Sequence, residues 1–287
     1  SLLLFSNSEF LILLCFTFGI LGIGYFLYRL EYFKIDKHRS ILSLVLMMII
    51  YSIISFWKLG STYFPTTTWQ PTAEKQQITF DFGNSEKFDA IYTIYGEGDT
   101  NSNPSAYQIG TNHIQIYASN NLQDWTHIAS LNQGNIYTYA IEQGNWQYRY
   151  IKLINLNANS SLTEIGFRKE DHTGFLPISI LRDKQKDGPY PGSLLIDEQE
   201  KLVLSPTYYD QAYFDEIYHV RNAWEIANGQ YMYANVHPLL GTNIIALSIH
   251  LFGMNPLAWR LPGAIAGVLM LPVLYGILKL LLKRDNL

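Results

Sequence analysis

Three long apolar runs constrain the fold of this chain more than any other feature. Residues 10–28 and 41–57 contain no charged side chain, and a third run extends from Leu261 to Leu282. Each run approaches the ~20 residues that an α-helix needs to cross the hydrocarbon core of a bilayer. A helix on the surface of a soluble protein is amphipathic, whereas these runs are apolar on all sides. The sequence therefore predicts three transmembrane helices, in preference to buried core helices of a soluble protein.

Basic residues beside these runs predict their orientation, because lysine and arginine are enriched in cytoplasmic loops. The basic residues lie between the first two runs and at the end of the third: Arg29, Lys34, Lys37, Arg39, Lys279, Lys283 and Arg284. We therefore expect both of these places in the cytoplasm. The chain from about Gly60 to Trp259 is then expected on the extracytoplasmic side.

The ends of the chain, its single cysteine and its charge add further limits. The sequence starts at Ser1 and stops soon after a lysine-rich apolar segment, so we expect a fragment of a longer membrane protein. A signal peptide is the alternative for the first run, but no basic region precedes it and no small-residue cleavage site follows it. Cys15 is the only cysteine, which excludes intramolecular disulfides and cysteine-based zinc sites. The net charge of -4 gives no reason to expect nucleic acid as a partner.

The middle of the chain changes to a period of two from Gln77 onward. Six segments alternate between apolar and polar residues: Ile78–Phe82, Ile91–Tyr95, His113–Ala118, Ile136–Ile141, Tyr148–Ile154 and Leu162–Phe167. Clusters of Gly, Asn, Ser and Asp separate them. Short strands at close spacing, with no helical pattern between them, predict an extracytoplasmic antiparallel β-sandwich.

Two stretches of this region resemble a known family. The stretch from Ile114 to Ala129 reads IQIYASNNLQDWTHIA, and the stretch from Tyr148 to Asn157 reads YRYIKLINLN. They resemble discoidin or coagulation-factor C-type domains of the galactose-binding-like fold, over roughly Thr72 to Arg168. The resemblance implies binding of glycans or other surface ligands through loops at one end, sometimes with a structural Ca²⁺.

Aromatic and polar residues of this region are candidate ligand sites. The candidates are Trp125, Trp146 and Tyr107 as rings that stack on sugars, and Asp99, Asn101 and Asn103 as a cation loop. An aromatic ring offers a large apolar face to the C–H groups of a sugar, but filling the core is the preferred interpretation for either tryptophan alone. The rest of a calcium ligand set is missing, which favours a solvated turn over the cation loop.

An acidic pair opens the predicted helix that follows. Apolar residues recur at spacings of four and three: Tyr213, Ile217, Val220, Trp224 and Ala227. Gly229 offers a stop, so Asp215 and Glu216 fall in the first turn, where the helix dipole favours ionised carboxylates. His219 and Asn222 share the Asp215 side of this helix and could line the same cavity. Helix capping and solubility are the alternative roles of the acidic pair.

Two further residues follow the acidic pair near the predicted membrane surface. His237 precedes a proline, and Arg260 stands at the start of the third run. A cation beside the bilayer suits a lipid-linked phosphate, although Arg260 next to Trp259 could equally be an interfacial anchor. Residues 239–253 are too short to span a bilayer comfortably, so we expect them to lie along it.

Three motifs follow one another in this region and read YFDEIYHVRNAWE, VHPLLG and FGMNPLAWRLPGAIAG. Over about Tyr208 to Tyr275 they resemble the protein O-mannosyltransferase family, which belongs to the GT-C superfamily of polyprenyl-phosphate-dependent glycosyltransferases. The resemblance implies that Asp215 is the general base for an acceptor hydroxyl and that Glu216 supports it. It also implies that Arg260 and His237 bind the carrier phosphate.

The resemblance extends to partners and location. The donor would be a polyprenyl-phosphate sugar, with mannose or another hexose, and the acceptor a protein, a glycan or a lipid. Transfer would proceed with inversion and without a cofactor or a metal. A β-sandwich inserted before the acidic pair resembles the architecture of some bacterial relatives, so we expect an integral protein of a bacterial plasma membrane.

Two departures from the family pattern leave an alternative open. The family usually reads His-Pro-Pro-Leu-Gly-Lys, whereas this chain has Leu239 for the second proline and Thr242 for the lysine. One expected phosphate-side cation is therefore absent. The alternative function is a catalytically inactive, membrane-tethered glycan-binding protein. If the parent protein is an enzyme, the fragment alone is expected to be inactive.

The predicted fold is a multi-span α-helical membrane protein of the GT-C type with an inserted antiparallel β-sandwich. Its parts are two transmembrane helices with a short cytoplasmic connection (1–59), the sandwich (60–182, core about 72–168), a connection (183–207), a catalytic loop with juxtamembrane helices (208–258), and a transmembrane helix that ends in the cytoplasm (259–287).

Overall fold

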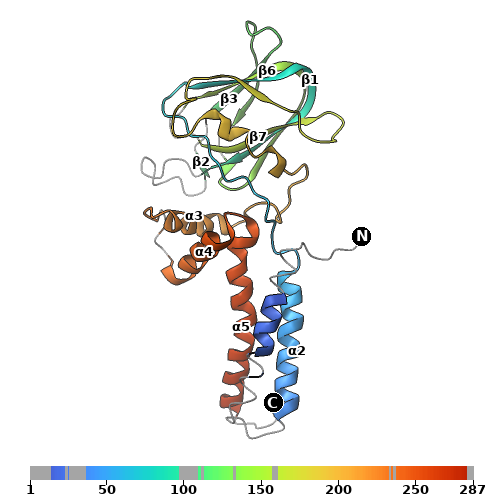
Figure 1. The fold of residues 1–287 in the computed structure, drawn as a ribbon, viewed down its shortest axis with the longest axis vertical. Coiled ribbons are helices and arrows are strands. Elements are labelled where there is room, and N and C mark those ends of the chain that lie inside the picture. The colour runs from blue at the N-terminus through green and yellow to red at the C-terminus, as the bar shows by residue number, and fades with distance from the viewer. Residues whose placement is uncertain are drawn as a thin grey trace.

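A β domain and a group of long helices form the two ends of the molecule (Figure 1). The computed structural model describes residues 14–22, 25, 37–96, 109–110, 113–131, 134–156, 161–232, 234 and 237–282. Helices α2 (Lys37–Phe56) and α5 (Pro256–Leu282) run side by side away from the β domain. Two shorter helices, α3 (Glu216–Ala227) and α4 (Leu239–Phe252), lie between the β domain and these long helices (Figure 1).

Helix α5 is long and apolar enough to cross a membrane. Its apolar stretch covers Pro256–Leu281, and only 6% of the most apolar window is buried, unlike the core helix of a soluble protein. The apolar parts of α2 (Ser40–Phe56) and of α4 are shorter. Within the first predicted run, residues 14–22 and 25 are helical, and the rest of that run lies outside the described residues.

The long helices pack against each other through apolar side chains. One cluster contains Ile20 from the first run, Leu44 and Met48 from α2, and Leu261 and Val268 from α5. Large apolar residues on the outer faces of these helices stay exposed, which is the pattern expected of helices that contact lipid. The basic residues Arg29, Lys34, Lys283 and Arg284, on which the predicted orientation depends, lie outside the described residues.

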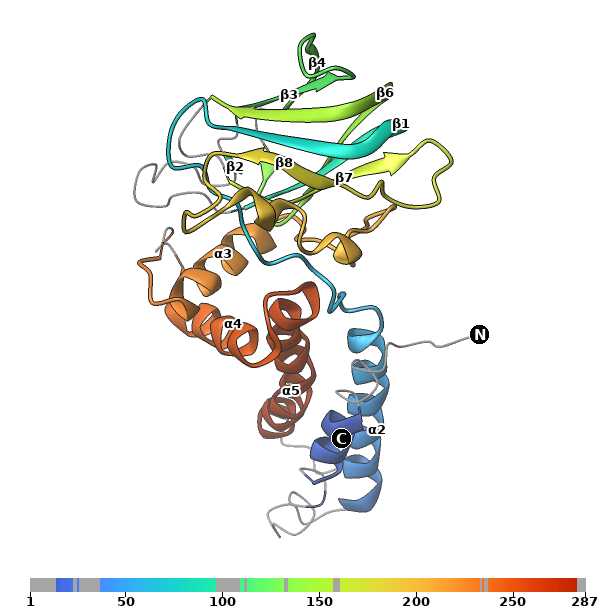
Figure 2. The same ribbon diagram turned by 45° about the horizontal axis from the view of Figure 1, so that its top comes forward.

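The β domain is antiparallel, as predicted. Its main strands are β1 (Gln77–Tyr95), β3 (Ile114–Ser119), β4 (Thr126–Leu131), β6 (Tyr139–Asn155), β7 (Leu162–Lys169) and β8 (Ser179–Asp183). They form one sheet in the order β4-β3-β6-β1-β7, and β8 also pairs with β1 (Figure 2). A second sheet contains the short strands β2 (Ile109–Gly110) and β5 (Gly134–Asn135).

Strand β1 differs from the sequence prediction in a way that shapes the domain. The two strands predicted at 78–82 and 91–95 are one 19-residue strand, whose register against β6 shifts between Asp81 and Glu86. The first part of β1 pairs with β8 and the last part with β7. Both parts contribute to one core, with Ile78 and Phe80 from the first and Ile91 and Tyr95 from the last. Strand β1 therefore contributes to the core along most of its length.

The segment after β7 packs onto the sheet and includes two short 3₁₀ helices, η1 (Gly192–Leu195) and η2 (Gln199–Lys201). Leu195 is fully buried in the core of the β domain. Beside it, Glu164 on β7 accepts hydrogen bonds from the backbone N–H of Glu198, at 3.1 Å, and from the amide of Gln199. Burial raises the pKa of Glu164 to about 9, so this carboxyl group is protonated at neutral pH.

A second hydrophobic cluster joins the β domain to α3, α4 and α5. It contains Ile94 and Tyr137 from the β domain, Val220 from α3, Ile249 from α4 and Trp259 from α5. Backbone hydrogen bonds support this contact, because the carbonyl of Tyr137 accepts from the N–H of Ala212 at 3.0 Å. The start of α3 is therefore attached to the β domain.

The buried face of α3 differs from the predicted apolar stripe. Ile217 and Val220 are buried as predicted, but Tyr213 precedes the helix and is 68% exposed. In its place, the buried face includes Arg221 and Glu225, whose side chains form an ion pair with 3.0 Å between Nε and Oε1. A buried pair one helical turn apart satisfies both charges, which a hydrophobic pattern does not reveal.

Candidate functional site

Arg260 and Glu216 form the structural centre of the candidate site. Glu216 is the first residue of α3, and Arg260 lies near the start of α5. The Nε and Nη2 atoms of Arg260 donate to the two carboxylate oxygens of Glu216, at 2.7 and 2.6 Å. Nη1 also donates to the carbonyl of Leu59, and Nη2 to the carbonyl of Gln211. One guanidinium thus joins the end of α2 to the starts of α3 and α5.

These contacts use most of the hydrogen-bonding capacity of Arg260. A guanidinium has five N–H groups, and four of them have partners here. Within the described part of the chain, one Nη1–H group is left for a ligand. Arg260 can therefore offer an anion its positive charge and a single hydrogen bond while the ion pair with Glu216 persists.

Glu216 has a structural task in addition to this ion pair. Its Oε2 atom accepts a hydrogen bond from the backbone N–H of Tyr213 at 3.0 Å, three residues before it. This bond satisfies one N–H group of the segment that leads into α3. Glu216 therefore ties this segment to the start of the helix.

Asp215 has a different environment from its neighbour. It occupies the N-cap position of α3, and its carboxylate makes no capping hydrogen bond. The side chain is exposed, and it forms no hydrogen bond or ion pair with any described residue. Of the acidic pair, Asp215 is therefore the carboxylate without a partner among the described residues.

A cavity of about 580 Å³ opens beside Glu216 and Arg260. Its lining residues come from the end of α2, from the segment before α3 and from α5: Ser55, Trp57, Lys58, Leu59, Tyr208, Tyr213, Glu216 and Arg260. Lys58 is exposed and forms no ion pair with the described residues. The sequence analysis did not single out Lys58. Its position directly after the second apolar run and Trp57 was the available signal, because tryptophan and lysine gather at membrane interfaces.

His219 and His237 come together beside α3. Their ring centres are 5.1 Å apart and the rings are tilted by 45°. His219 belongs to α3, whereas His237 lies just before α4. Neither histidine lines the cavity that contains Glu216 and Arg260. Of the predicted site residues, Glu216 and Arg260 thus line the cavity and the two histidines form a pair, whereas Asp215 and Asn222 belong to neither group.

Asn222 connects α3 to the loop that leads to His237. It is 2% exposed, and its amide donates to the carbonyl of Ala234 at 2.6 Å and accepts from the N–H of Ala234 at 3.1 Å. In this structure the side chain of Asn222 therefore holds the loop against α3.

The two positions that depart from the family pattern lie at the start of α4. Leu239 is 52% exposed, whereas Thr242 is 4% exposed. The hydroxyl-bearing side chain of Thr242 is therefore inside the protein. Position 242, where the family has a lysine, does not line the cavity, whereas Lys58 does. Lys58 is therefore better placed than a residue at position 242 to bring positive charge to the cavity.

The remaining candidates belong to the β domain. Trp146 packs against Phe88, with 5.3 Å between ring centres, and borders the core, which agrees with the core-filling interpretation. Trp125 lines a different cavity on the surface of the domain. Among the described residues, no group of three or more His, Cys, Asp or Glu side chains is arranged to hold a metal. The proposed cation loop of 99–103 and Tyr107 lie outside the described residues.

Comparison with known proteins gives a short match to one class of enzyme. No family model matches this chain. Over 72 residues, or 23% of the chain, it is 36% identical to a polyprenol-phosphate-mannose–protein mannosyltransferase of Mycolicibacterium smegmatis. The protein of the same name from Mycobacterium tuberculosis is 32% identical over 72 residues. The match spans 14% of the length of each relative. This local similarity covers a small part of both proteins, so it is a likeness between segments and not between whole chains.

Two solved structures are similar to part of the chain. CpGH89CBM32-6 of Clostridium perfringens has a TM-score of 0.30 and 20% identity, over 39% of this chain and 82% of that one. CBM32-1 from a family 31 glycoside hydrolase of the same organism has a TM-score of 0.28 and 14% identity, over 39% of this chain and 91% of that one. Both TM-scores are below 0.5, so neither likeness carries a conclusion about a ligand.

Proposed function

We propose that this chain belongs to a glycosyltransferase that moves a sugar from a polyprenyl-phosphate carrier to an acceptor hydroxyl. The observation that carries this proposal is that the two carboxylates of the acidic pair have different environments. Glu216 is held by Arg260 at the mouth of a cavity, and Asp215 beside it is exposed and without a partner among the described residues. The local similarity to mannosyltransferases supports the same reaction class.

The reaction is a displacement at the anomeric carbon of the donor sugar. The acceptor oxygen forms a new bond to this carbon while the bond to the carrier phosphate breaks and its electron pair leaves with the phosphate. Asp215 takes the proton of the acceptor hydroxyl as the attack proceeds. Positioned general bases accelerate such steps by roughly 10²–10⁴-fold. A single displacement inverts the anomeric centre, because no carboxylate of the protein forms a covalent intermediate.

Positive charge near the cavity would stabilise the departing phosphate. Lys58 is exposed at the cavity, and Arg260 retains one N–H group and its charge. Cationic side chains aimed at developing negative charge are a common source of transition-state stabilisation. We assign the carrier phosphate to this pair of cations, with His237 of the histidine pair as a further candidate.

The proposed orientation places the cavity at the membrane surface. It adjoins the end of α2 and the start of α5, the helix that is long enough to span a bilayer. A carrier with a lipid tail could then remain in the membrane while its phosphate reaches the cavity. In this proposal residues 10–28, 41–57 and 261–282 all span a bacterial plasma membrane, and the β domain is extracytoplasmic.

Sugar transfer from defined donors tests the proposal. Membranes that contain the full-length protein to which this chain belongs would be incubated with radiolabelled polyprenyl-phosphate mannose, polyprenyl-phosphate glucose or the corresponding nucleotide sugars. We expect transfer to a membrane or protein acceptor from a polyprenyl-phosphate sugar and none from a nucleotide sugar. Transfer from nucleotide sugars alone, or from no donor, would refute the proposed reaction.

A cation variant separates donor binding from the folding of the site. Lys58→Ala is expected to raise the KM for the polyprenyl-phosphate sugar about tenfold, because a hydrogen bond to a charged group contributes ~1.5–3 kcal/mol. Lys87→Ala is the matched control, since Lys87 is an exposed cation of the β domain. An unchanged donor KM in Lys58→Ala would remove Lys58 from the phosphate site.

A further inference from the structure

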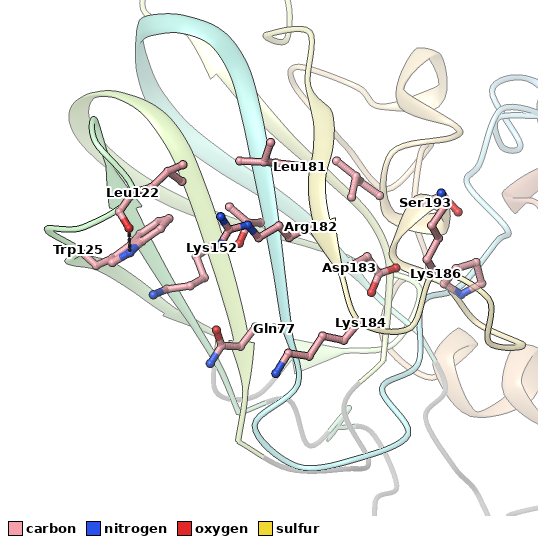
Figure 3. A pocket seen from close by; sticks show the side chains of 13 residues that line it. Gln77, Leu122, Trp125, Lys152, Leu181, Arg182, Asp183, Lys184, Lys186 and Ser193 are labelled. Carbon is pink, nitrogen blue, oxygen red and sulfur yellow. Dashed lines mark hydrogen bonds between the residues drawn. The ribbon is translucent and has the colours of Figure 1, made fainter.

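The outer surface of the β domain contains a second cavity, of about 830 Å³ (Figure 3). Its walls come from β1, β6 and β8, from the turn between β3 and β4, and from the segment after β8. Cavities of roughly 300–1,000 Å³ are the usual size of small-ligand sites. The cavity is separate from the candidate active site, because the two share no lining residue.

The alternation of the strands places a polar row in this cavity. Ile78 and Phe80 on β1, and Ile151 and Leu153 on β6, belong to the core. The residues between them, Thr79 and Lys152, therefore lie on the opposite, outer face. Thr79 pairs with Lys152 of β6 on one side and with Arg182 of β8 on the other. The strand pairing thus places one cation on each side of Thr79, Lys152 on β6 and Arg182 on β8.

The cavity has a strong excess of positive charge. Four basic side chains line it, namely Lys152, Arg182, Lys184 and Lys186, against the single carboxylate of Asp183. The two oxygens of Asp183 accept hydrogen bonds from the backbone N–H groups of Gln185, at 2.8 Å, and Gly192, at 2.7 Å. In the described part of the chain, none of the four cations forms an ion pair. The whole protein has a net charge of -4, so this concentration of positive charge is local.

Trp125 adds an aromatic surface to this charged cavity. Its indole N–H donates to the carbonyl of Leu122 at 3.2 Å, which orients the ring. The Nζ atom of Lys152 lies 4.0 Å from the centre of the ring. Figure 3 shows Trp125 and Lys152 on one side of the cavity, with Arg182 extending toward them from β8. Partial burial lowers the pKa of Lys152, which means that its ammonium group would gain from an anionic partner.

We propose that this cavity binds an acidic saccharide, whose ring contacts Trp125 and whose carboxylate or phosphate group is held by Lys152 and Arg182. An aromatic ring suits the apolar C–H face of a sugar, and a guanidinium pairs with a carboxylate or phosphate through two parallel hydrogen bonds. The four cations gather around one cavity with a single indole, which favours a short acidic saccharide over a long polyanion. A long polyanion would be expected to follow an extended basic stripe.

Binding of defined oligosaccharides to the full chain in detergent tests this site. The probes are oligogalacturonate, oligoglucuronate and a sugar phosphate oligomer, together with the neutral, carboxyl-reduced forms of the first two. We expect at least one acidic probe to bind, with an affinity about tenfold or more above its neutral form and with a decrease at high salt. Equal binding of acidic and neutral forms, or no binding of any acidic probe, would overturn the proposal.

Two variants identify the cavity as the place of binding. Arg182→Ala and Trp125→Ala are each expected to weaken binding of the acidic probe about tenfold, because each removes one of the two kinds of contact. Lys87→Ala, which removes an exposed cation elsewhere on the β domain, should leave binding unchanged. Since Arg182 is exposed, its loss is not expected to unfold the domain, and a thermal unfolding curve would check this.

Two other classes of anionic ligand, lipid vesicles and a single-stranded oligonucleotide, are measured in the same binding experiment. Vesicles with anionic lipid that bind more tightly than the oligosaccharides, through Arg182, would show that the cavity recognises a membrane surface and would overturn the saccharide assignment. Tighter binding of a single-stranded oligonucleotide than of any saccharide would do the same. Sugar transfer at the separate active site should persist in Arg182→Ala, so failure of this inference and failure of the proposed enzyme activity are distinguishable.

Discussion

Glu216 and Arg260 are 44 positions apart in the sequence, yet the guanidinium of Arg260 donates to both oxygens of the Glu216 carboxylate. This ion pair joins the first turn of α3 to the start of α5 and borders the cavity at the end of α2. The two members of the acidic pair therefore differ: Glu216 is held by Arg260, whereas Asp215 has no partner among the described residues.

The ion pair predicts different stabilities for variants of two adjacent residues. Glu216→Gln leaves the charge of Arg260, whose side chain is 10% exposed, without its partner. The free energy of unfolding is expected to fall by about 1.5–3 kcal/mol, because hydrogen bonds between charged groups are lost. Asp215→Asn should stay within about 0.5 kcal/mol of the parent, as is usual for an exposed residue without partners. Thermal unfolding in detergent measures both, and an equal loss in the two variants would contradict this arrangement.

Gly60, shortly after α2, lies close to the backbone at the start of α5. A Cβ atom at Gly60 would lie 2.5 Å from the carbonyl carbon of Pro256, and backbone atoms cannot move aside as a flexible side chain can. Gly60→Ala should therefore displace the start of α5 and with it Arg260, lowering both stability and sugar transfer. Gly263→Ala is the matched control, because nothing lies within 4 Å of its added Cβ in the same helix. A parent-like melting temperature for Gly60→Ala would show that this close approach is not required.

Glu164 predicts an unusual dependence of stability on pH. Its pKa is raised by burial from 4.5 to about 9, so between these values the unfolded chain binds fewer protons than the folded one. Stability should therefore decrease as the pH rises through this interval, by up to about 1.4 kcal/mol per pH unit from this residue alone. Glu164→Gln should remove the decrease and stabilise the protein at neutral pH.

Unfolding of the parent and of Glu164→Gln between pH 5 and 9 measures this effect. Glu74→Gln serves as the control, because Glu74 is exposed and its loss should leave the slope unchanged. Parallel pH profiles for the parent and Glu164→Gln would show that Glu164 is ionised in the folded protein.

The sequence predicts the apolar helices and the β domain well because both depend on simple local patterns. Uncharged runs identified α2 and α5, and alternation identified most strands of the sheet. Alternation divided two long strands in two: β1 at the register shift after Asp81, and β6, which is continuous from Tyr139 to Asn155. Alternation also missed β4 and β8. Strand β8 takes its place through pairing with β1, a distant segment that a local pattern does not reveal.

The helix start at the acidic pair was predictable from the sequence, whereas Lys58 in the cavity and the contacts of Glu216 were not. The spacing around Asp215 and Glu216 indicated an acidic pair at a helix start, which the structure confirms for Glu216 at the first position and for Asp215 at the cap. No local pattern indicates that Arg260 pairs with Glu216, because this contact depends on tertiary packing, with α4 lying against both α3 and α5. The buried pair of Arg221 and Glu225 was missed because charged residues on a helix normally indicate its solvated face.

The most direct test of the account is the rate of sugar transfer by Asp215→Asn in the full-length protein. Turnover of a polyprenyl-phosphate sugar at saturating donor would be compared among the parent, Asp215→Asn and the exposed control Asp187→Asn. Asp215→Asn is expected to lose roughly 10²-fold or more in turnover, because a general base is removed, while its expression and stability stay normal. Turnover of Asp215→Asn equal to that of the parent and of Asp187→Asn would contradict the assignment of Asp215 as the base.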